Sequence, residues 1–215
     1  MSKNKKITVF GGSGAAGLLL IEKALSKGYA VTAFVRTPSK IPIRHDNLTI
    51  MQGNLTDVQK IEEAVTGSEA IISILGPVPK SKGLVVANGM KNIIAAAKKS
   101  GVKRLIATVT PSFADSNDKF QFSFAFAVFM IKKLVKESYY DIVQTGKYVS
   151  ESGLDWTLVR LPMLSTKPET GEVHAGYVGD GRLNLFSLTR ADLANFLLEQ
   201  IGSKKWNGKA PAISN

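Results

Sequence analysis

The amino-acid sequence predicts an α/β protein with a doubly wound parallel sheet, covered by helices on both faces. Short runs rich in Ile, Val and Ala alternate with longer segments of helical periodicity. The short runs are predominantly apolar, which is typical of strands buried on both faces rather than strands with one face in water. The 215 residues contain no repeat, linker or break in composition. We therefore expect a single domain over residues 1–215.

Six apolar runs are the expected strands. They are Ile7–Phe10, Ala30–Val35, Leu48–Met51, Ala70–Leu75, Arg104–Thr110 and Asp155–Leu161. Branched and aromatic side chains are frequent in them, and such residues suit a buried pleated surface. Gly76-Pro77, Pro111 and Pro162 follow the last three runs. Because proline has no N–H for a strand ladder, these positions end the strands.

Four segments between or after the strands are expected to be helices. They are Ala15–Lys27, Thr56–Val65, Gly83–Lys99 and Arg190–Ile201. Gly28 ends the first helix, and Thr56 with Asp57 supplies capping groups at the start of the second. Asp192, near the start of the last helix, fits capping better than catalysis.

Composition excludes several classes of function. The chain has no cysteine, so it has no disulfide, thiolate metal site or cysteine nucleophile. His45 and His174 lie far apart, and we expect no metal. The longest apolar run, Phe124 to Ile131, is too short to cross a bilayer, so we expect a cytoplasmic protein without stable membrane insertion. The net charge of +11 is spread over short basic groups, which argues against a nucleic-acid partner.

A glycine-rich loop directly follows the first predicted strand and opens the first predicted helix. The loop reads Gly11, Gly12, Ser13, Gly14, Ala15, Ala16 and Gly17, and from Gly12 it has the G-x-G-x-x-G spacing. Glycines permit a tight turn and let backbone N–H groups approach a pyrophosphate, which the helix N-terminus also attracts. The sequence therefore predicts a dinucleotide-binding site.

The end of the second predicted strand indicates which dinucleotide is preferred. An NAD-selective site usually has Asp or Glu there to accept a hydrogen bond from the ribose 2′-hydroxyl. This chain has Arg36, which is unable to accept such a bond and suits a 2′-phosphate; Lys40 is near enough to assist. We expect NADP(H) to be preferred, with NAD(H) binding still permitted. The alternative is that Arg36 only stacks on adenine or faces water.

Several motifs spread along nearly the whole chain resemble those of one known family. Beside the glycine loop they are Val31–Arg36, Gly53–Asp57 (G-N-L-T-D), Gly89–Ala96, Gly101–Arg104, Ser152–Arg160 and Thr189–Ala194. Together they resemble the atypical short-chain dehydrogenases/reductases of the NmrA-like NAD(P)H-binding group. The best match within that group is the NADPH-dependent flavin reductase (biliverdin reductase B) type. The resemblance implies a Rossmann fold, with a small C-terminal region on the substrate side.

The resemblance also implies roles for individual positions. At the adenine and ribose end the positions are Asn54, Leu55, Leu75 and Gly76. At the reaction end they are Thr110, where relatives commonly have the active-site Ser, Lys147 on the following helix, and Pro162 and Met163 near the nicotinamide.

One departure from ordinary short-chain dehydrogenases limits the reactions that we expect this protein to catalyse. None of the five tyrosines has a lysine four positions later, so the Tyr-x-x-x-Lys proton donor is absent. We expect an NADPH-dependent reductase that passes hydride to a flat conjugated acceptor, such as a flavin, quinone or tetrapyrrole, with the proton coming from water. The alternative is a non-catalytic NADP-binding redox sensor or regulator of the NmrA type. Either a monomer or a homodimer is compatible with the sequence.

The segment Phe113–Met130 contains six of the ten phenylalanines. From Phe120 to Phe126 they recur at every second residue, which predicts that helical structure begins only near Ala125. Three interpretations remain open. The segment is buried in the core or a subunit contact, it forms an apolar wall or lid over the nicotinamide, or it lies on a membrane surface beside Lys132, Lys133 and Lys136.

Overall fold

The computed structural model describes residues 5–77, 83–183 and 187–215. They contain an eight-stranded sheet in the order β3-β2-β1-β4-β5-β6-β10-β8. Its strands are β1 (Lys6–Phe10), β2 (Ala30–Val35), β3 (Leu48–Gln52), β4 (Ala70–Ser73), β5 (Arg104–Val109), β6 (Asp155–Arg160), β8 (His174–Gly176) and β10 (Ala212–Ser214). Neighbouring strands pair in parallel except β8, which is antiparallel to β10. The predicted doubly wound parallel sheet is therefore confirmed, with one antiparallel strand added at its edge.

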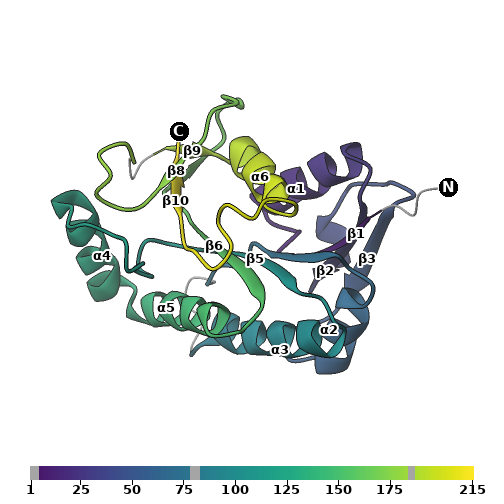
Figure 1. Cartoon of the computed structure of the whole chain (residues 1–215). Helices are drawn as coiled ribbons and strands as arrows, with labels where there is room; N and C mark the ends of the chain where they lie inside the picture. The colour runs from purple at the N-terminus through teal and green to yellow at the C-terminus, as the bar shows by residue number, and fades with distance from the viewer. Residues whose placement is uncertain (1–4, 78–82, 184–186) are drawn as a thin grey trace.

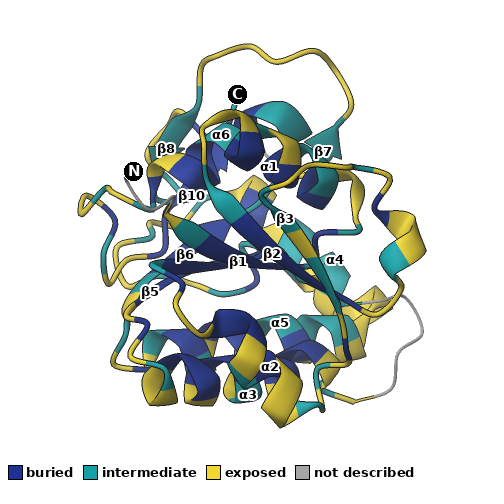
Figure 2. Cartoon of the chain, turned by 90° about the vertical axis from the view of Figure 1, so that its right-hand side faces the viewer, coloured by how far each residue is buried: buried dark blue, intermediate teal, exposed yellow. Residues whose placement is uncertain are grey.

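Helices cover both faces of the sheet (Figure 1). On one face lie α1 (Ala15–Ser26) and α6 (Arg190–Glu199), and on the other lie α2 (Val58–Val65), α3 (Val85–Lys99) and α5 (Lys136–Ser150). The buried strands lie between these two layers (Figure 2). A short helix, η1 (Pro38–Lys40), follows β2, and β7 (Leu164–Ser165) pairs with β9 (Leu188–Thr189) in a small second sheet. Helix α4 (Phe122–Leu134) stands at the side of this sandwich (Figure 1).

The core divides into one apolar cluster on each face of the sheet. Leu20 of α1 and Leu193 of α6 are fully buried in the first cluster, and Ile61 of α2 and Met90 of α3 are buried in the same way in the second. Burying such a side chain contributes about 1.5–3 kcal/mol. The predominantly apolar strands, which predicted a sheet buried on both faces, thus contact helices on both sides.

Strand β1 lies where the winding direction of the sheet changes. Ile7 is opposite Val31 of β2 on one side and Ala70 of β4 on the other. The chain proceeds from β1 to β2 and β3 in one direction, and then from β4 to β5 and β6 in the other. Ligands of open α/β sheets bind at the carboxyl ends of the strands at such a point, because the connecting loops separate there.

The start of α4 differs from the prediction, which was wrong in placing helical structure only from near Ala125. The helix begins at Phe122. Phe124 points inward and is buried with Val178, Leu183 and Ala212, whereas Phe122 and Phe126 are exposed. Alternating phenylalanines are compatible with a helix here because they occupy two opposite faces of it.

Other boundaries differ from the prediction by one or two residues. Helix α2 begins at Val58 rather than Thr56, because the Asp57 carboxylate accepts a hydrogen bond from the Asn54 N–H (2.8 Å) in the preceding turn. The sequence did not predict β7 to β10. Within the described residues, no helix has the length and apolar character required to span a membrane.

Asp192 attaches the start of α6 to a neighbouring loop. Thr189 is the N-cap; its hydroxyl accepts from the Asp192 N–H (3.0 Å) and donates to the Asp192 carboxylate (2.6 Å). The carboxylate also accepts from the N–H groups of Thr170 (3.0 Å) and Gly171 (2.9 Å). Burial opposes ionisation of Asp192, but these hydrogen bonds outweigh burial and lower its pKa below the ordinary value. Thr189 rather than Asp192 is thus the residue that caps α6, and Asp192 joins this cap to the loop at residues 170–171.

Candidate functional site

The glycine loop joins β1 tightly to α1. Gly11 has φ +87°, in the left-handed region that favours glycine, and a Cβ there would lie 2.8 Å from the carbonyl oxygen of Ile74, the residue after β4. A Cβ on Gly17 would overlap the carbonyl oxygen of Gly11. Because only glycine fits at both positions, the helix begins directly against the strand and the loop stays narrow.

The start of α1 offers backbone donors to an anion. Its N-cap is Gly14, which supplies no side-chain cap; its N–H donates to Gly11 (3.2 Å) and its carbonyl accepts from Leu18 (2.9 Å). The first N–H groups of a helix have no partner within that helix, and the helix dipole is positive at this end. The arrangement fits a pyrophosphate group.

A cleft of about 840 Å³ opens at the carboxyl ends of β1, β2 and β4. This volume is within the range of small-molecule and cofactor sites. Its walls also include the start of α3 and the residues after β3. Seven of the predicted cofactor residues line it: Gly11, Ser13, Arg36, Asn54, Leu55, Leu75 and Gly76.

The remaining loop positions lie beside the cleft rather than in its lining. Gly12 is buried, and a Cβ on it would lie 2.8 Å from Ile21 of α1. Gly14 and Ala15 are exposed at the start of α1, while Ala16 and Gly17 are buried in its first turn. Lys40, at the end of η1, is exposed and does not line the cleft.

Arg36 provides a positive charge at the rim of the cleft. It directly follows β2, and its side chain is exposed. Its backbone carbonyl accepts from the Gln52 side chain (3.3 Å), which joins it to the end of β3. Among the described residues, no carboxylate forms an ion pair with Arg36. The guanidinium is thus available to an anionic ligand.

The G-N-L-T-D motif forms one wall of the cleft. Gly53 lies against the Phe34 ring so closely that a Cβ would overlap it, and Asp57 accepts from the Asn54 N–H (2.8 Å). The Asn92 side chain, on α3, donates to the Leu55 carbonyl (2.7 Å). The motif connects β3 to α2 along the chain, and these contacts hold it against Phe34 of β2 on one side and Asn92 of α3 on the other.

Thr110 directly follows β5. Its hydroxyl accepts from the Ser112 N–H (3.3 Å) and its carbonyl accepts from the Phe113 N–H (3.1 Å). The Thr110 hydroxyl therefore retains its own proton for donation to another group. The Ser112 hydroxyl is buried and has no hydrogen-bond partner among the described residues.

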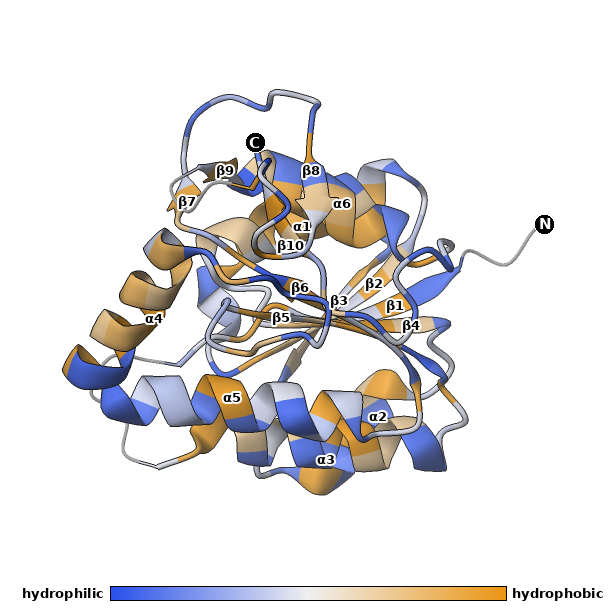
Figure 3. Cartoon of the chain, turned by 60° about the vertical axis from the view of Figure 1, so that its left-hand side comes forward, coloured by the Kyte–Doolittle hydropathy of each residue, from blue (hydrophilic) through white to orange (hydrophobic). Residues whose placement is uncertain are grey.

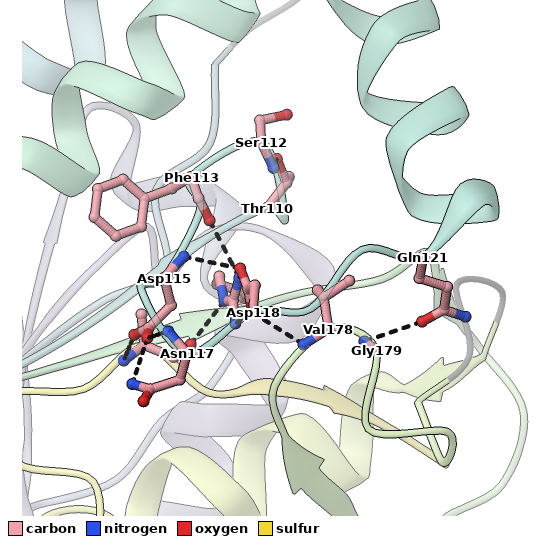
Figure 4. A network of polar contacts seen from close by, with 11 residues as sticks. Thr110, Ser112, Phe113, Asp115, Asn117, Asp118, Gln121, Val178 and Gly179 are labelled. Carbon is pink, nitrogen blue, oxygen red and sulfur yellow. Dashed lines mark hydrogen bonds and ion pairs between the residues drawn. The ribbon is translucent and has the colours of Figure 1, made fainter.

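A buried ion pair fixes the loop after Thr110 (Figure 4). Arg160, at the end of β6, is fully buried and binds both carboxylate oxygens of Asp118 (2.5 and 2.7 Å). Asp118 also accepts from the N–H groups of Asp115 (2.8 Å) and Val178 (3.0 Å). The guanidinium donates further to the Ala210 carbonyl (2.7 Å). One ion pair thus joins the end of β6 to three other segments.

Thr110 and the other predicted reaction-end residues are not part of the cleft lining. Lys147 is exposed in the last turn of α5, whose buried face includes Asp141, Thr145 and Val149. Pro162 and Met163 follow β6, at the same edge of the sheet as Thr110, and Met163 is exposed. The structure does not bring Lys147 to the cleft, and its catalytic role stays a prediction.

Sequence reasoning missed two groups of residues at this site. The first lines the cleft through apolar or small side chains, including Phe10, Phe34 and Gly89, which resemble ordinary core positions in a sequence. The second is the pair of Arg160 and Asp118. Arg160 was part of a quoted motif, but its partner is 42 residues away and no local signal joins the two.

The strand–glycine loop–helix unit and the cleft at the turning point of the sheet define a dinucleotide-binding protein of the Rossmann type. The profile of the NAD(P)H-binding family matches residues 11–204, and the chain belongs to that family. Its fold is that of short-chain dehydrogenases/reductases. A structure of such a protein from Veillonella parvula superposes with a TM-score of 0.83 at 19% identity, covering 99% of this chain and 95% of that chain. A structure from the same organism in complex with NADP gives 0.81 at 18% identity, with the same coverage.

Curated relatives match over part of their length. An uncharacterized chloroplastic protein of Arabidopsis thaliana is 30% identical over 186 residues, which cover 80% of this chain and 63% of that protein. A 3-beta-hydroxysteroid dehydrogenase of Mycolicibacterium neoaurum is 31% identical over 119 residues, or 50% of this chain and 32% of that protein. The chain thus corresponds to less than two thirds of either relative.

Proposed function

We propose that this protein is an NADPH-dependent reductase that transfers hydride to a flat conjugated acceptor such as a flavin, a quinone or a linear tetrapyrrole. The observation that carries the proposal is the cleft, which is lined by the glycine loop and by Arg36, and Arg36 has no ion-pair partner in the described part of the chain. Membership of the NAD(P)H-binding family supports the nucleotide. The missing Tyr-x-x-x-Lys pair and the resemblance to the flavin reductase type support the acceptor.

The residues of the cleft fit NADPH. Backbone N–H groups from Gly11 to Gly17 would bind the pyrophosphate, and the guanidinium of Arg36 would bind the 2′-phosphate, with Lys40 nearby. The Asn54 and Leu55 loop would hold adenine, and Leu75 and Gly76 would contact ribose. None of these residues has a carboxylate side chain, so none of them would repel the phosphates of the cofactor.

At the other end, the nicotinamide would lie near Thr110, Pro162 and Met163. When bound, NADPH supplies a hydride and becomes NADP⁺; the acceptor takes this hydride together with one proton from water. The Thr110 hydroxyl, which already accepts from Ser112, would donate to the nicotinamide amide or to an acceptor oxygen. The role of Thr110 would be to orient the reacting groups. Lys147, which is exposed on α5, is a second candidate for a catalytic role.

The test has two parts. Calorimetric titration with NADPH and NADH measures cofactor binding and preference. Steady-state oxidation of NADPH is then followed with flavin mononucleotide, a soluble quinone and biliverdin as acceptors. Turnover with at least one of them is expected. Tight NADPH binding without turnover on any acceptor would contradict the proposal and favour the non-catalytic regulator instead.

A further inference from the structure

Helix α4 presents phenylalanines to water. Phe122, Phe126 and Phe129 recur at the i, i+4 and i+7 positions of one helical face and are 72%, 55% and 53% exposed. Phe120, just before the helix, is 82% exposed. Four phenylalanines exposed to this extent present roughly 500 Å² of aromatic surface. This area is at the upper end of the apolar patches found on monomers, and such patches commonly mark interaction sites. We call Phe120, Phe122, Phe126 and Phe129 the aromatic stripe.

The aromatic stripe does not hold α4 to the rest of the protein. The opposite face does so through Phe124, which is 5% exposed and packs with Val178, Leu183 and Ala212. The loop before the helix is fixed by the buried pair of Asp118 and Arg160 described above. Figure 3 shows the apolar helix standing at the side of the molecule. The stripe is therefore a second apolar face, directed away from the core.

The charges around the stripe indicate what covers it. Lys119, Lys132, Lys133 and Lys136 flank or end the helix, and residues 119–136 contain no Asp or Glu. Within the described part of the chain, none of these lysines forms an ion pair. The Lys133 ammonium lies 5.8 Å from the Phe129 ring centroid, on the side of the stripe. A second copy of α4 would bring the same positive charges and no carboxylate to neutralise them.

We propose that α4 docks this protein on the surface of an anionic phospholipid membrane. The phenylalanines of the stripe insert at the boundary between headgroups and acyl chains, while the lysines contact the lipid phosphates. Aromatic side chains beside lysines are typical of helices that lie in this interface.

Cosedimentation of the whole chain with lipid vesicles tests the aromatic part. One set of vesicles contains phosphatidylcholine alone and the other contains phosphatidylcholine with phosphatidylglycerol. We expect binding to the second set, weakened by added salt. Phe122→Ala with Phe126→Ala should lower the partition coefficient at least tenfold with an unchanged melting temperature, because both side chains are exposed. Val58→Ala, a substitution at another exposed apolar residue, should leave binding unchanged.

The lysines are tested with a charge-matched control. Each lysine near an anionic surface contributes about fivefold to partitioning, so Lys132→Gln with Lys133→Gln should lower it by roughly 25-fold. Lys98→Gln with Lys103→Gln removes the same charge near the opposite edge of the sheet and should have little effect.

Three results would overturn the proposal. The first is no binding to the anionic vesicles. The second is an equal loss of vesicle partitioning in the control variant with Lys98 and Lys103 replaced. Such a result would mean that the net charge of +11, and not α4, causes the binding. The third is a dimer in lipid-free solution that the phenylalanine variant dissociates, without vesicle binding, which would assign the stripe to a second copy. None of these readouts depends on NADPH turnover.

Discussion

Replacing Arg36 tests the cofactor assignment most directly. Arg36 is exposed at the rim of the cleft, so its removal should leave the fold stable. A hydrogen bond to a charged group contributes about 1.5–3 kcal/mol, and exposure to water favours the lower end of that range. Arg36→Ala should therefore raise the Kd for NADPH by about tenfold. Arg36→Glu adds repulsion of about 1 kcal/mol for charges near 4 Å in water, so its total effect should approach about 50-fold.

Isothermal calorimetry with both cofactors measures these changes. The Kd for NADH should change by less than about threefold with Arg36→Ala, because NADH has no 2′-phosphate. Arg44→Ala is a suitable control, since Arg44 is also exposed and does not line the cleft. The preference for NADPH should decrease as ionic strength rises. Equal losses of NADPH and NADH affinity would refute the role of Arg36 in discrimination.

Three further changes address the reaction end and the supports of the fold. Thr110→Val, which removes one hydroxyl and keeps the shape of the side chain, should lower kcat with little change in melting temperature. If kcat is unchanged in Thr110→Val but lower in Lys147→Met, the catalytic role belongs to Lys147 instead. Asp118→Asn leaves the buried Arg160 charge without its partner and should lower the free energy of unfolding by about 3 kcal/mol in urea titrations, and a change below about 1 kcal/mol would mean that the pair is dispensable. The lowered pKa of Asp192 stabilises the fold above the unfolded-state pKa of about 3.9, and this stabilisation is lost as pH falls through the folded-state value. Unfolding free energies should thus decline less steeply below about pH 5 in Asp192→Asn than in the unchanged protein, and equal slopes would contradict the assignment.

The sequence predicted those structural features that depend on residues close together in the chain. The glycine loop was predictable because its glycine spacing directly follows a mostly apolar strand, and in the structure Gly11 and Gly17 occupy positions that no side chain fits. The edge strand β8 was not predictable, since only three residues form it and its pairing with β10 depends on segments far apart in sequence. The start of α4 was misjudged because phenylalanines on two opposite helical faces mimic a strand pattern.

By itself, the sequence determined the alternation of strands and helices, the glycine-rich loop between the first strand and the first helix, and the positive residue after the second strand. These features depend on residues that are neighbours in the chain, so their backbone preferences and side-chain spacing can be recognised from the sequence. The tertiary structure alone decided which residues share the cleft, that Arg160 and Asp118 form an ion pair, and that Lys147 is exposed and not part of the cleft lining. Each of these depends on how separate elements pack, and packing joins residues whose sequence separation carries no signal of contact.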